Sequence, residues 1–189
     1  MKSFFGFALL AISFWSPLAG AAPAEILVIR HAEKISDSEP GLSPKGFQRA
    51  NALVDLFKKD PRLLDYGTPV AIFAGTAKHS DGSIRPLQTI QPLAKALGLT
   101  PRTDFESKDD TAMVASIMSN PAYNGKTVLI CWPHQEIPDI AHALGMKKKK
   151  IPNWDGGTFD RVWKFTIDNG DVASFEDLPE RALPGDSQN

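Results

Sequence analysis

The sequence predicts an α/β fold, a three-layer α/β/α sandwich with a mainly parallel central sheet. Short apolar runs typical of buried strands occur at about residues 25–30, 70–74 and 128–132. Segments with apolar residues at helical spacing alternate with these runs, which is the pattern of helices packed on a parallel sheet. The chain has 189 residues, 42% of them hydrophobic, so it is long and apolar enough for one domain with a substantial core.

The first predicted helix begins at Ser43-Pro44 and ends before Asp60-Pro61. Serine is a favoured N-cap residue, and proline fits the first helical position because its missing N–H is not needed there. A proline after Asp60 cannot continue the helix. The apolar residues of this segment follow helical spacing: Ala50, Leu53, Val54 and Phe57.

Three further helices are predicted at residues 84–97, 109–119 and 137–144. Gly98 and Gly145 follow the first and the last of them, and glycine is the usual residue where a helix ends in a left-handed conformation. The helices therefore occupy the stretches between and after the predicted strands.

The sequence predicts a β-hairpin in the C-terminal part of the chain. Residues 161–168 and 172–175 have strand character, and Asn169-Gly170 between them is a strong two-residue hairpin signal. The tail from Pro179 onward is polar and is expected to be loose.

The N-terminus predicts a secretory signal at residues 1–21. Lys2 precedes a mostly apolar segment that ends in Ala19-Gly20-Ala21, a small-x-small cleavage pattern, and cleavage as late as residue 24 fits equally. An uncleaved anchor helix is the alternative, but the segment is short for a bilayer, which needs ~20 apolar residues. We therefore expect one mature domain, residues 22–189, in the periplasm or secreted, with no stable membrane insertion.

Charge and cysteine content exclude several classes of protein. The formal net charge is −1, so no global basic field favours nucleic acid. The lysine run at residues 147–150 is interpreted as a solvated turn rather than a phosphate or membrane patch. Cys131 is the only cysteine, so no intrachain disulfide is possible, and its apolar flanks predict a buried thiol. The four histidines, at positions 31, 79, 134 and 142, lack metal-ligand spacing, so no metal is expected.

Cationic side chains follow the predicted strands. Arg30-His31 ends the first strand, His134 follows the third, and Arg85 begins the helix that comes after the second. The carboxyl ends of parallel strands meet at one edge of a sheet, so these residues can converge. Arginine binds phosphate oxygens through two N–H groups, and a neutral imidazole can attack phosphorus. The sequence therefore predicts phosphoryl transfer, which also requires a carboxylic acid to protonate the leaving oxygen.

Four motifs in this order resemble those of the histidine phosphatase superfamily, which has the phosphoglycerate mutase-like fold. Arg30-His31 resembles its Arg-His-Gly signature, and residues 41–50 resemble its GLT-x-x-G-x-x-QA helix start. Residues 85–89 resemble its R-A-x-Q-T element, and residues 128–134 resemble the strand before its second histidine. Each motif alone is weak, but four in order indicate a small exported bacterial-type member.

The resemblance implies roles for matching positions. His31 is the expected nucleophile, and Arg30 and Arg85 are expected to hold the phosphoryl oxygens. His134 is the expected second histidine, which donates to the phosphate. Glu33 follows the signature and is expected to line the pocket or to orient its residues. No cofactor is implied.

Two positions depart from the motifs. Ala32 replaces the glycine after the first histidine, which is a mild change. Pro133 replaces the glycine before the second histidine, and because proline has no N–H and a fixed φ, the local backbone is expected to differ.

The proton donor is the least determined part of the predicted site. In one branch of the superfamily the acid follows the second histidine, but here Gln135 stands there and Glu136 comes next. In another branch a glutamate lies after the second helix, where Glu106 is a candidate. We favour Glu136 slightly over Glu106. Other acids in the same segment also compete: Asp104, Asp109 and Asp110.

Other polar residues have ordinary alternatives. Gln88 and Thr89 either share the pocket face of their helix with Arg85 or pack the helix. His142 is expected to be structural. Three residues are surface cations by default but could line the rim of the pocket: Lys34, Lys78 and His79.

The predicted function is an exported phosphatase, of the histidine acid type, that hydrolyses phosphomonoesters through a phosphohistidine on His31 without a metal. Its substrate is expected to be a small-molecule or envelope phosphomonoester, and residues 78–83 and 103–111 are expected to line the mouth of the site. A protein that binds phosphate without turnover is the alternative, motivated by Pro133 and the undetermined acid. A mutase is disfavoured by export. The sequence predicts no oligomeric state.

Overall fold

A computed structural model describes residues 22–77 and 82–189. The predicted signal at residues 1–21, and Lys78 and His79 of the predicted rim, lie outside the described residues. Within them the chain forms a five-stranded sheet in the order β2-β3-β1-β4-β5. The strands are β1 Glu25–Arg30, β2 Ala71–Ala74, β3 Thr127–Trp132, β4 Arg161–Asp168 and β5 Asp171–Pro179.

Three neighbouring strands are parallel, as predicted. β1 pairs with β3 from Glu25↔Thr127 to Arg30↔Trp132, and β2 pairs with β3 up to Ala74↔Cys131. The carboxyl ends of the three strands therefore meet at one edge of the sheet, which is the condition for the predicted site.

The sheet is only partly parallel. β4 pairs antiparallel with β1, and β5 pairs antiparallel with β4. The prediction of a mainly parallel sheet is therefore matched only in part. A parallel crossover must return the chain to the amino edge of the sheet. Helix α4, Ile137–Ala143, rises only ~10 Å, and residues 156–158 are back at the carboxyl end of β1. β4 therefore starts at that edge and runs in the opposite direction.

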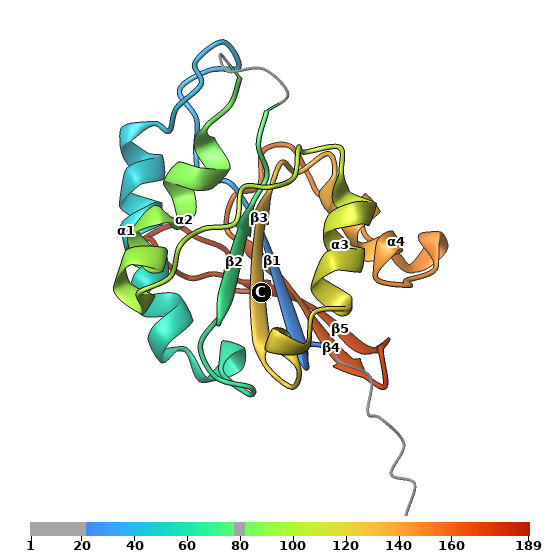
Figure 1. Ribbon diagram of the computed structural model, residues 1–189. Helices are drawn as coiled ribbons and strands as arrows, with labels where there is room; N and C mark the ends of the chain where they lie inside the picture. Colours follow the sequence, from blue (N-terminus) through green and yellow to red (C-terminus); the bar gives the residue numbers. More distant parts are fainter. Residues whose placement is uncertain (1–21, 78–81) are drawn as a thin grey trace, which may run out of the picture.

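Helices cover both faces of the sheet, as Figure 1 shows. Helices α1 (Pro44–Lys59) and α2 (Arg85–Leu97) pack on one face, and α3 (Asp110–Met118) and α4 pack on the other. β1 is buried along its whole length, and its alternate residues enter different cores. Ile26 and Val28 face α3 and α4, whereas Leu27 and Ile29 face α1 and α2. The predicted three-layer sandwich is confirmed.

Local sequence signals explain where several elements begin and end. The Ser43 hydroxyl accepts the N–H of Gly46 at 3.1 Å and caps α1. The Asp60 carboxylate accepts the N–H of Arg62 at the start of the short 3₁₀ helix η1, Pro61–Leu63. Gly98 ends α2 with φ 67°.

The C-terminal hairpin forms as predicted, with Asn169 at φ 51° and Gly170 at φ 87° between β4 and β5. The expectation of a loose tail is wrong. Glu180 and Asp186 are buried, and both carboxylates bind Arg49 of α1. The polar composition of the tail predicts a solvated segment, but the buried guanidinium of Arg49 in α1 binds two of its carboxylates and fixes it to the fold.

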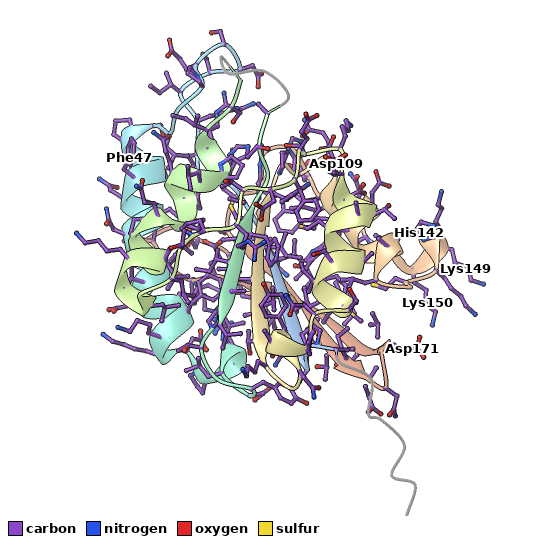
Figure 2. The ribbon with its side chains drawn as sticks, in the orientation of Figure 1. Phe47, Asp109, His142, Lys149, Lys150 and Asp171 are labelled. Atoms are coloured by element: carbon purple, nitrogen blue, oxygen red, sulfur yellow. The ribbon has the colours of Figure 1, made fainter. Side chains whose placement is uncertain are left out.

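The expectations of a buried Cys131 and of a solvated lysine run agree with the fold. Cys131 is buried, and the rings of Trp154 and Trp163 lie 5.1 Å apart in the core. Lysines 147–150 are exposed around the 3₁₀ helix η3, Lys148–Lys150, and Figure 2 shows Lys149 and Lys150 beyond α4, away from the sheet. Among the described residues, none of the helices is both long enough and apolar enough to span a membrane.

Candidate active site

The ends of β1 and β3 are joined by a backbone hydrogen bond, and the Thr89 side chain joins the end of β1 to the start of α2. The N–H of His31 donates to the carbonyl of Trp132 at 3.2 Å. The N–H of Ala32 donates to the Thr89 hydroxyl at 2.8 Å, and that hydroxyl donates to the carbonyl of Arg85 at 2.8 Å. Thr89 therefore fixes the backbone after His31 to the start of α2. Gln88 has a related role, since its side-chain oxygen accepts the N–H of Leu42 at 2.9 Å.

His31 is held in the form that a nucleophile requires. It is 5% exposed, and its Nδ1 lies 2.8 Å from the carbonyl oxygen of Ala32. A carbonyl can only accept, so Nδ1 carries the proton and Nε2 keeps its lone pair. Burial lowers the pKa of His31 to about 4, and the charges of Arg30 and Arg85 add to this effect. The imidazole is therefore neutral at pH 7.

Arg30 is buried at the carboxyl end of β1, and three of its five N–H donors have no partner among the described residues. Its Nη1 donates to the carbonyls of Gly156 at 2.6 Å and Thr158 at 3.0 Å. The Phe159 ring centroid lies 3.8 Å from its Cζ. Within the described part of the chain, Nε and Nη2 have no hydrogen-bond partner. Burial lowers the pKa of Arg30 to about 10, so the guanidinium stays charged at pH 7 and offers donors to an anion.

His134 lies in a turn directly after β3. The N–H of Glu136 donates to the carbonyl of Pro133 at 3.2 Å, and because β3 ends at Trp132, the missing N–H of Pro133 removes no ladder bond. The Nδ1 of His134 is buried and has no partner among residues 22–77 and 82–189. Burial, together with the charge of Arg30, lowers the pKa of His134. Pro133 thus starts the turn that brings this second histidine to the edge of the sheet.

Arg85 is engaged with the loop that follows β1. Its guanidinium donates to the backbone carbonyls of Ser36 at 3.0 Å and of Glu39, and more weakly to those of Asp37 and Gly41 at 3.4 Å. Its charge still acts at the site, because it contributes to the lowered pKa values of His31 and Arg30. Its assignment as a direct phosphate ligand stays a prediction.

Glu33 contacts cations of α1. Its two carboxylate oxygens accept from Arg49 Nε at 3.0 Å and from Arg49 Nη2 at 2.9 Å. The Nζ of Lys45 lies 3.2 Å from Glu33 Oε1. Burial opposes ionisation, but the hydrogen bonds from Arg49 outweigh it and lower the pKa of Glu33. Of the two predicted roles, these contacts favour that of an orienting residue.

Sequence reasoning assigned no role to Arg49, although it is 2% exposed and binds three carboxylates, one after β1 and two in the C-terminal segment. Its position contained a signal. Arg49 falls on the same helical face as Ala50, Leu53 and Leu56, and an arginine within an apolar stripe is buried only when paired.

The candidate proton donors differ in burial and pairing. Glu136 is buried next to the turn of His134 and pairs with Lys108, which is 83% exposed. Glu106 is exposed and follows Phe105, whose carbonyl accepts the N–H of Thr76 beyond β2. The other three acids have separate partners or environments. Asp104 pairs with Arg102 at 2.7 Å, Asp109 accepts the N–H of Glu106 at 3.1 Å, and burial raises the pKa of Asp110.

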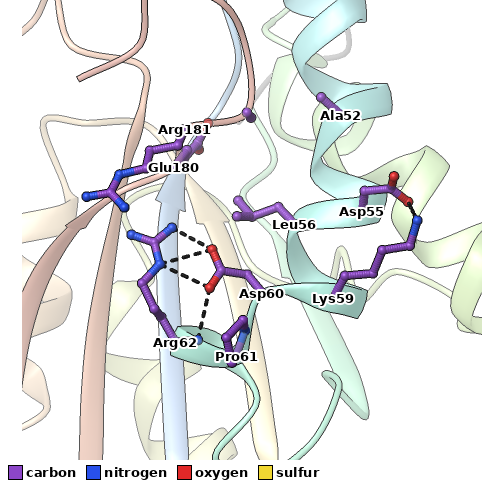
Figure 3. Close-up of a pocket in the computed structure, with 10 residues that line it drawn as sticks. Ala52, Asp55, Leu56, Lys59, Asp60, Pro61, Arg62, Glu180 and Arg181 are labelled. Carbon is purple, nitrogen blue, oxygen red and sulfur yellow. Dashed lines mark hydrogen bonds and ion pairs between the residues drawn. The ribbon is translucent and has the colours of Figure 1, made fainter. Parts of the chain in front are cut away.

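Two hollows lie near the C-terminal segment, and neither of them is lined by His31, Arg30 or His134. One of about 520 Å³ lies between the end of α1, η1 and the C-terminal segment, and Figure 3 shows its ion pairs Asp60–Arg62 and Asp55–Lys59. It contains none of the predicted site residues. A second hollow of about 360 Å³ is lined by Glu33, Arg49, Phe159 and Asp186, among others, and therefore adjoins the ring that covers Arg30. Across the described residues, no cluster of three or more His, Cys, Asp or Glu side chains has a metal-binding arrangement.

Comparisons with known proteins identify the fold. No family model and no curated protein matches the chain. Among solved structures, it resembles the alpha-ribazole phosphatase of Shigella flexneri with TM-score 0.58 and 12% identity, over 85% of this chain and 98% of that one. It resembles a phosphoglycerate mutase of Plasmodium falciparum with TM-score 0.57 and 14% identity, over 87% and 96% of the two chains. A phosphoserine phosphatase mutant of Entamoeba histolytica, in complex with phosphoserine, matches with TM-score 0.56 and 15% identity, over 84% and 98%. The chain therefore has the phosphoglycerate mutase-like fold.

Proposed function

We propose that this chain is a phosphatase of the histidine phosphatase superfamily that hydrolyses phosphomonoesters through a phosphohistidine on His31. The observation that supports this most is the state of His31. Its imidazole is neutral, its proton is on Nδ1, and it lies next to Arg30, whose Nε and Nη2 have no partner among the described residues. The fold shared with phosphatases and a mutase adds to this argument.

In the proposed reaction the lone pair of His31 Nε2 attacks phosphorus in line with the ester oxygen. The N–P bond forms, the P–O bond to the leaving group breaks, and a carboxylic acid protonates the leaving oxygen. Arg30 donates to the phosphoryl oxygens through Nε and Nη2, and His134 donates from a protonated ring nitrogen. Fixed donors of this kind contribute about 3 to 4 kcal/mol each to transition-state stabilisation. Water then attacks phosphorus, the N–P bond breaks, and the carboxylate takes the proton of the water.

We propose Glu136 as the proton donor ahead of Glu106, because Glu136 is buried beside His134 whereas Glu106 is exposed. Glu136 pairs with the exposed Lys108, so in the proposed reaction this lysine moves aside when the carboxyl group protonates the leaving oxygen. Glu136→Gln and Glu106→Gln distinguish the two. Loss of the true donor slows an alkyl phosphate far more than p-nitrophenyl phosphate, whose leaving group needs no proton. A larger selective loss in Glu106→Gln would reassign the role.

The direct test uses the mature protein, residues 22–189, with p-nitrophenyl phosphate in the presence of a chelator. We expect turnover by the wild type, a trapped acid-labile phosphohistidine after rapid quench with labelled substrate, and neither in His31→Ala. Equal rates for the two proteins would exclude the mechanism.

The substrate class and location are part of the proposal. A small-molecule or envelope phosphomonoester fits the predicted export to the periplasm or beyond. Expression of the full chain with mass analysis of the product tests this, because cleavage gives a mature N-terminus between residues 22 and 25. A product retaining Met1 would contradict cleavage at this signal.

A second candidate function is binding of phosphate without turnover. The Phe159 ring stacks on the Arg30 guanidinium, and the carboxylate of Glu136, the proposed proton donor, is paired with Lys108. Protection of the fold by inorganic phosphate in a melting experiment, with no phosphohistidine and no hydrolysis, would support binding alone.

A further inference from the structure

Glu33, two residues after His31, is held against the start of α1 by its backbone and by its side chain. The carbonyl of Glu33 accepts the N–H of Ser43 at 2.9 Å. A Cβ at Gly46 would lie 2.2 Å from the same carbonyl oxygen, so only glycine permits this approach. One turn later, Arg49 binds both carboxylate oxygens of Glu33. The segment that contains the nucleophile is therefore tied to Arg49.

The opposite side of Arg49 binds the C-terminal segment. Asp186 accepts from Nη1 at 2.9 Å and from Nη2 at 2.8 Å, and Glu180 accepts from Nη1 at 2.7 Å. Asp186 also accepts the N–H groups of Ala182 and Leu183, both at 2.9 Å, so one carboxylate organises this turn of the chain. Arg49 is thus a bridge between the β1–α1 loop and the C-terminal segment.

The same C-terminal segment holds the loop that contacts Arg30. The N–H of Glu180 donates to the backbone carbonyl of Asp160 at 2.8 Å. The N–H of Ser187 donates to the side-chain carboxylate of Asp160 at 2.6 Å. Asp160 directly follows Phe159, whose ring stacks on Arg30 and lies 6.0 Å from the ring of His31. Residues 180–187 therefore connect to both loops that surround the nucleophile.

We propose that Arg49, Glu180 and Asp186 form a C-terminal clamp of positioning residues, which sets the placement of His31 relative to Arg30 and the loop 156–159. The inference rests on the proposed function for its kinetic consequence, but the contacts themselves do not. The clamp residues touch neither substrate nor the reacting atoms. They act through Glu33 on one side and Asp160 on the other.

Arginine is required at position 49 because its planar guanidinium can donate hydrogen bonds to several carboxylates at once, whereas the lysine ammonium is a single point charge. Misplacement of a reacting group by ~1 Å can cost ~100-fold in rate. We therefore expect Arg49→Lys and Asp186→Asn to lower kcat by about 10- to 100-fold. KM for p-nitrophenyl phosphate is expected to change less than kcat.

The control separates positioning from stability. Ile167→Ala removes a buried side chain of β4, on the core that faces α3 and α4, far along the strand from the site. Measured at a temperature where all three variants are folded, Ile167→Ala is expected to keep the wild-type kcat. A kcat for the clamp variants as high as that of Ile167→Ala would overturn the proposal.

A second readout does not depend on turnover. NMR titration of the His31 imidazole in the mature protein reports its burial, since burial holds its pKa at about 4. In the clamp variants we expect this pKa to rise toward the ordinary value, while Ile167→Ala leaves it unchanged. If the wild type hydrolyses nothing, the proposed function fails, and the titration still decides whether the clamp exists. An unchanged His31 pKa in both clamp variants would then exclude it.

Discussion

Arg30 and Arg49 are both buried, at 1% and 2% exposure, yet their surroundings are opposite. Every nitrogen of the Arg49 guanidinium donates to a carboxylate, and these contacts raise its pKa although burial lowers it. Arg30 has two backbone carbonyls and an aromatic ring, and burial lowers its pKa to about 10. One arginine is fully paired and the other keeps unpartnered donors within the described part of the chain.

The difference indicates which arginine serves the fold and which serves the chemistry. A buried donor without a partner costs ~1–3 kcal/mol, so proteins keep few of them. Such a cost is explained at Arg30 if a phosphate supplies the missing partners. Arg49 has no donor left for a ligand, and its contacts join segments far apart in sequence.

The largest expected effect is on stability, at Arg49. Arg49→Met keeps the length of the side chain but leaves the buried Glu180 and Asp186 without the cation that they bind, and leaves Glu33 with Lys45 alone. Breaking a buried ion pair in this way costs ~3–5 kcal/mol. Urea unfolding of the mature protein measures this loss. A loss under 1 kcal/mol would mean that the network contributes little and that the contrast between the two arginines is wrong.

Arg30→Met is expected to show the reverse pattern. The fold loses two backbone hydrogen bonds but also a costly unpaired cation, so the free energy of unfolding should change by less than ~1 kcal/mol. Hydrolysis of p-nitrophenyl phosphate should fall by about 100- to 1,000-fold, because a preorganised donor to the phosphoryl oxygens is lost. Wild-type kinetics in this variant would show that Arg30 is structural.

Binding of inorganic phosphate gives the third test of the comparison. Phosphate at 100 times its dissociation constant stabilises the folded state by ~2.7 kcal/mol. We expect this gain in the wild type and its loss in Arg30→Met. Lys59→Met serves as the control, because this exposed residue of α1 lies outside the candidate site and removes the same charge. Equal stabilisation of wild type and Arg30→Met would place the anion elsewhere.

The two arginines also show what the sequence could predict. Arg30 follows an apolar run, so its place at the carboxyl end of a buried strand could be predicted from local pattern alone. Ser43 caps the helix that directly follows it, and Asn169-Gly170 turns the chain between two adjacent strands, so both could also be predicted from local sequence. The C-terminal partners of Arg49, Glu180 and Asp186, lie 131 and 137 residues away, in a tail whose polar composition is typical of a solvated segment. Arg85 could be placed at a helix start, but its contacts to the loop 36–41 depend on a backbone path that no local signal determines.

The smallest expected effect is the pH dependence of stability contributed by Glu180. Burial raises its pKa to about 8, while Arg49 opposes this shift and Asp186 and Asp160 add to it. The folded state therefore holds a proton that the unfolded state loses above its ordinary pKa of about 4.5. The stability from Glu180 is fully present below that value and is lost as pH rises through about 8, with a slope of at most ~1.4 kcal/mol per pH unit.

Glu180→Gln should remove this slope, because glutamine keeps the shape and does not titrate. Buried Glu25, whose pKa is raised to about 7, contributes a slope of the same sign, so the informative quantity is the difference between wild type and variant. Asp168→Asn at the exposed end of β4 is the control and should retain the slope that Glu180 contributes. Urea unfolding between pH 5 and 9 measures all three proteins. If Glu180→Gln has the wild-type slope, Glu180 is ionised in the folded protein, and Arg49 then lies among three charged carboxylates rather than two.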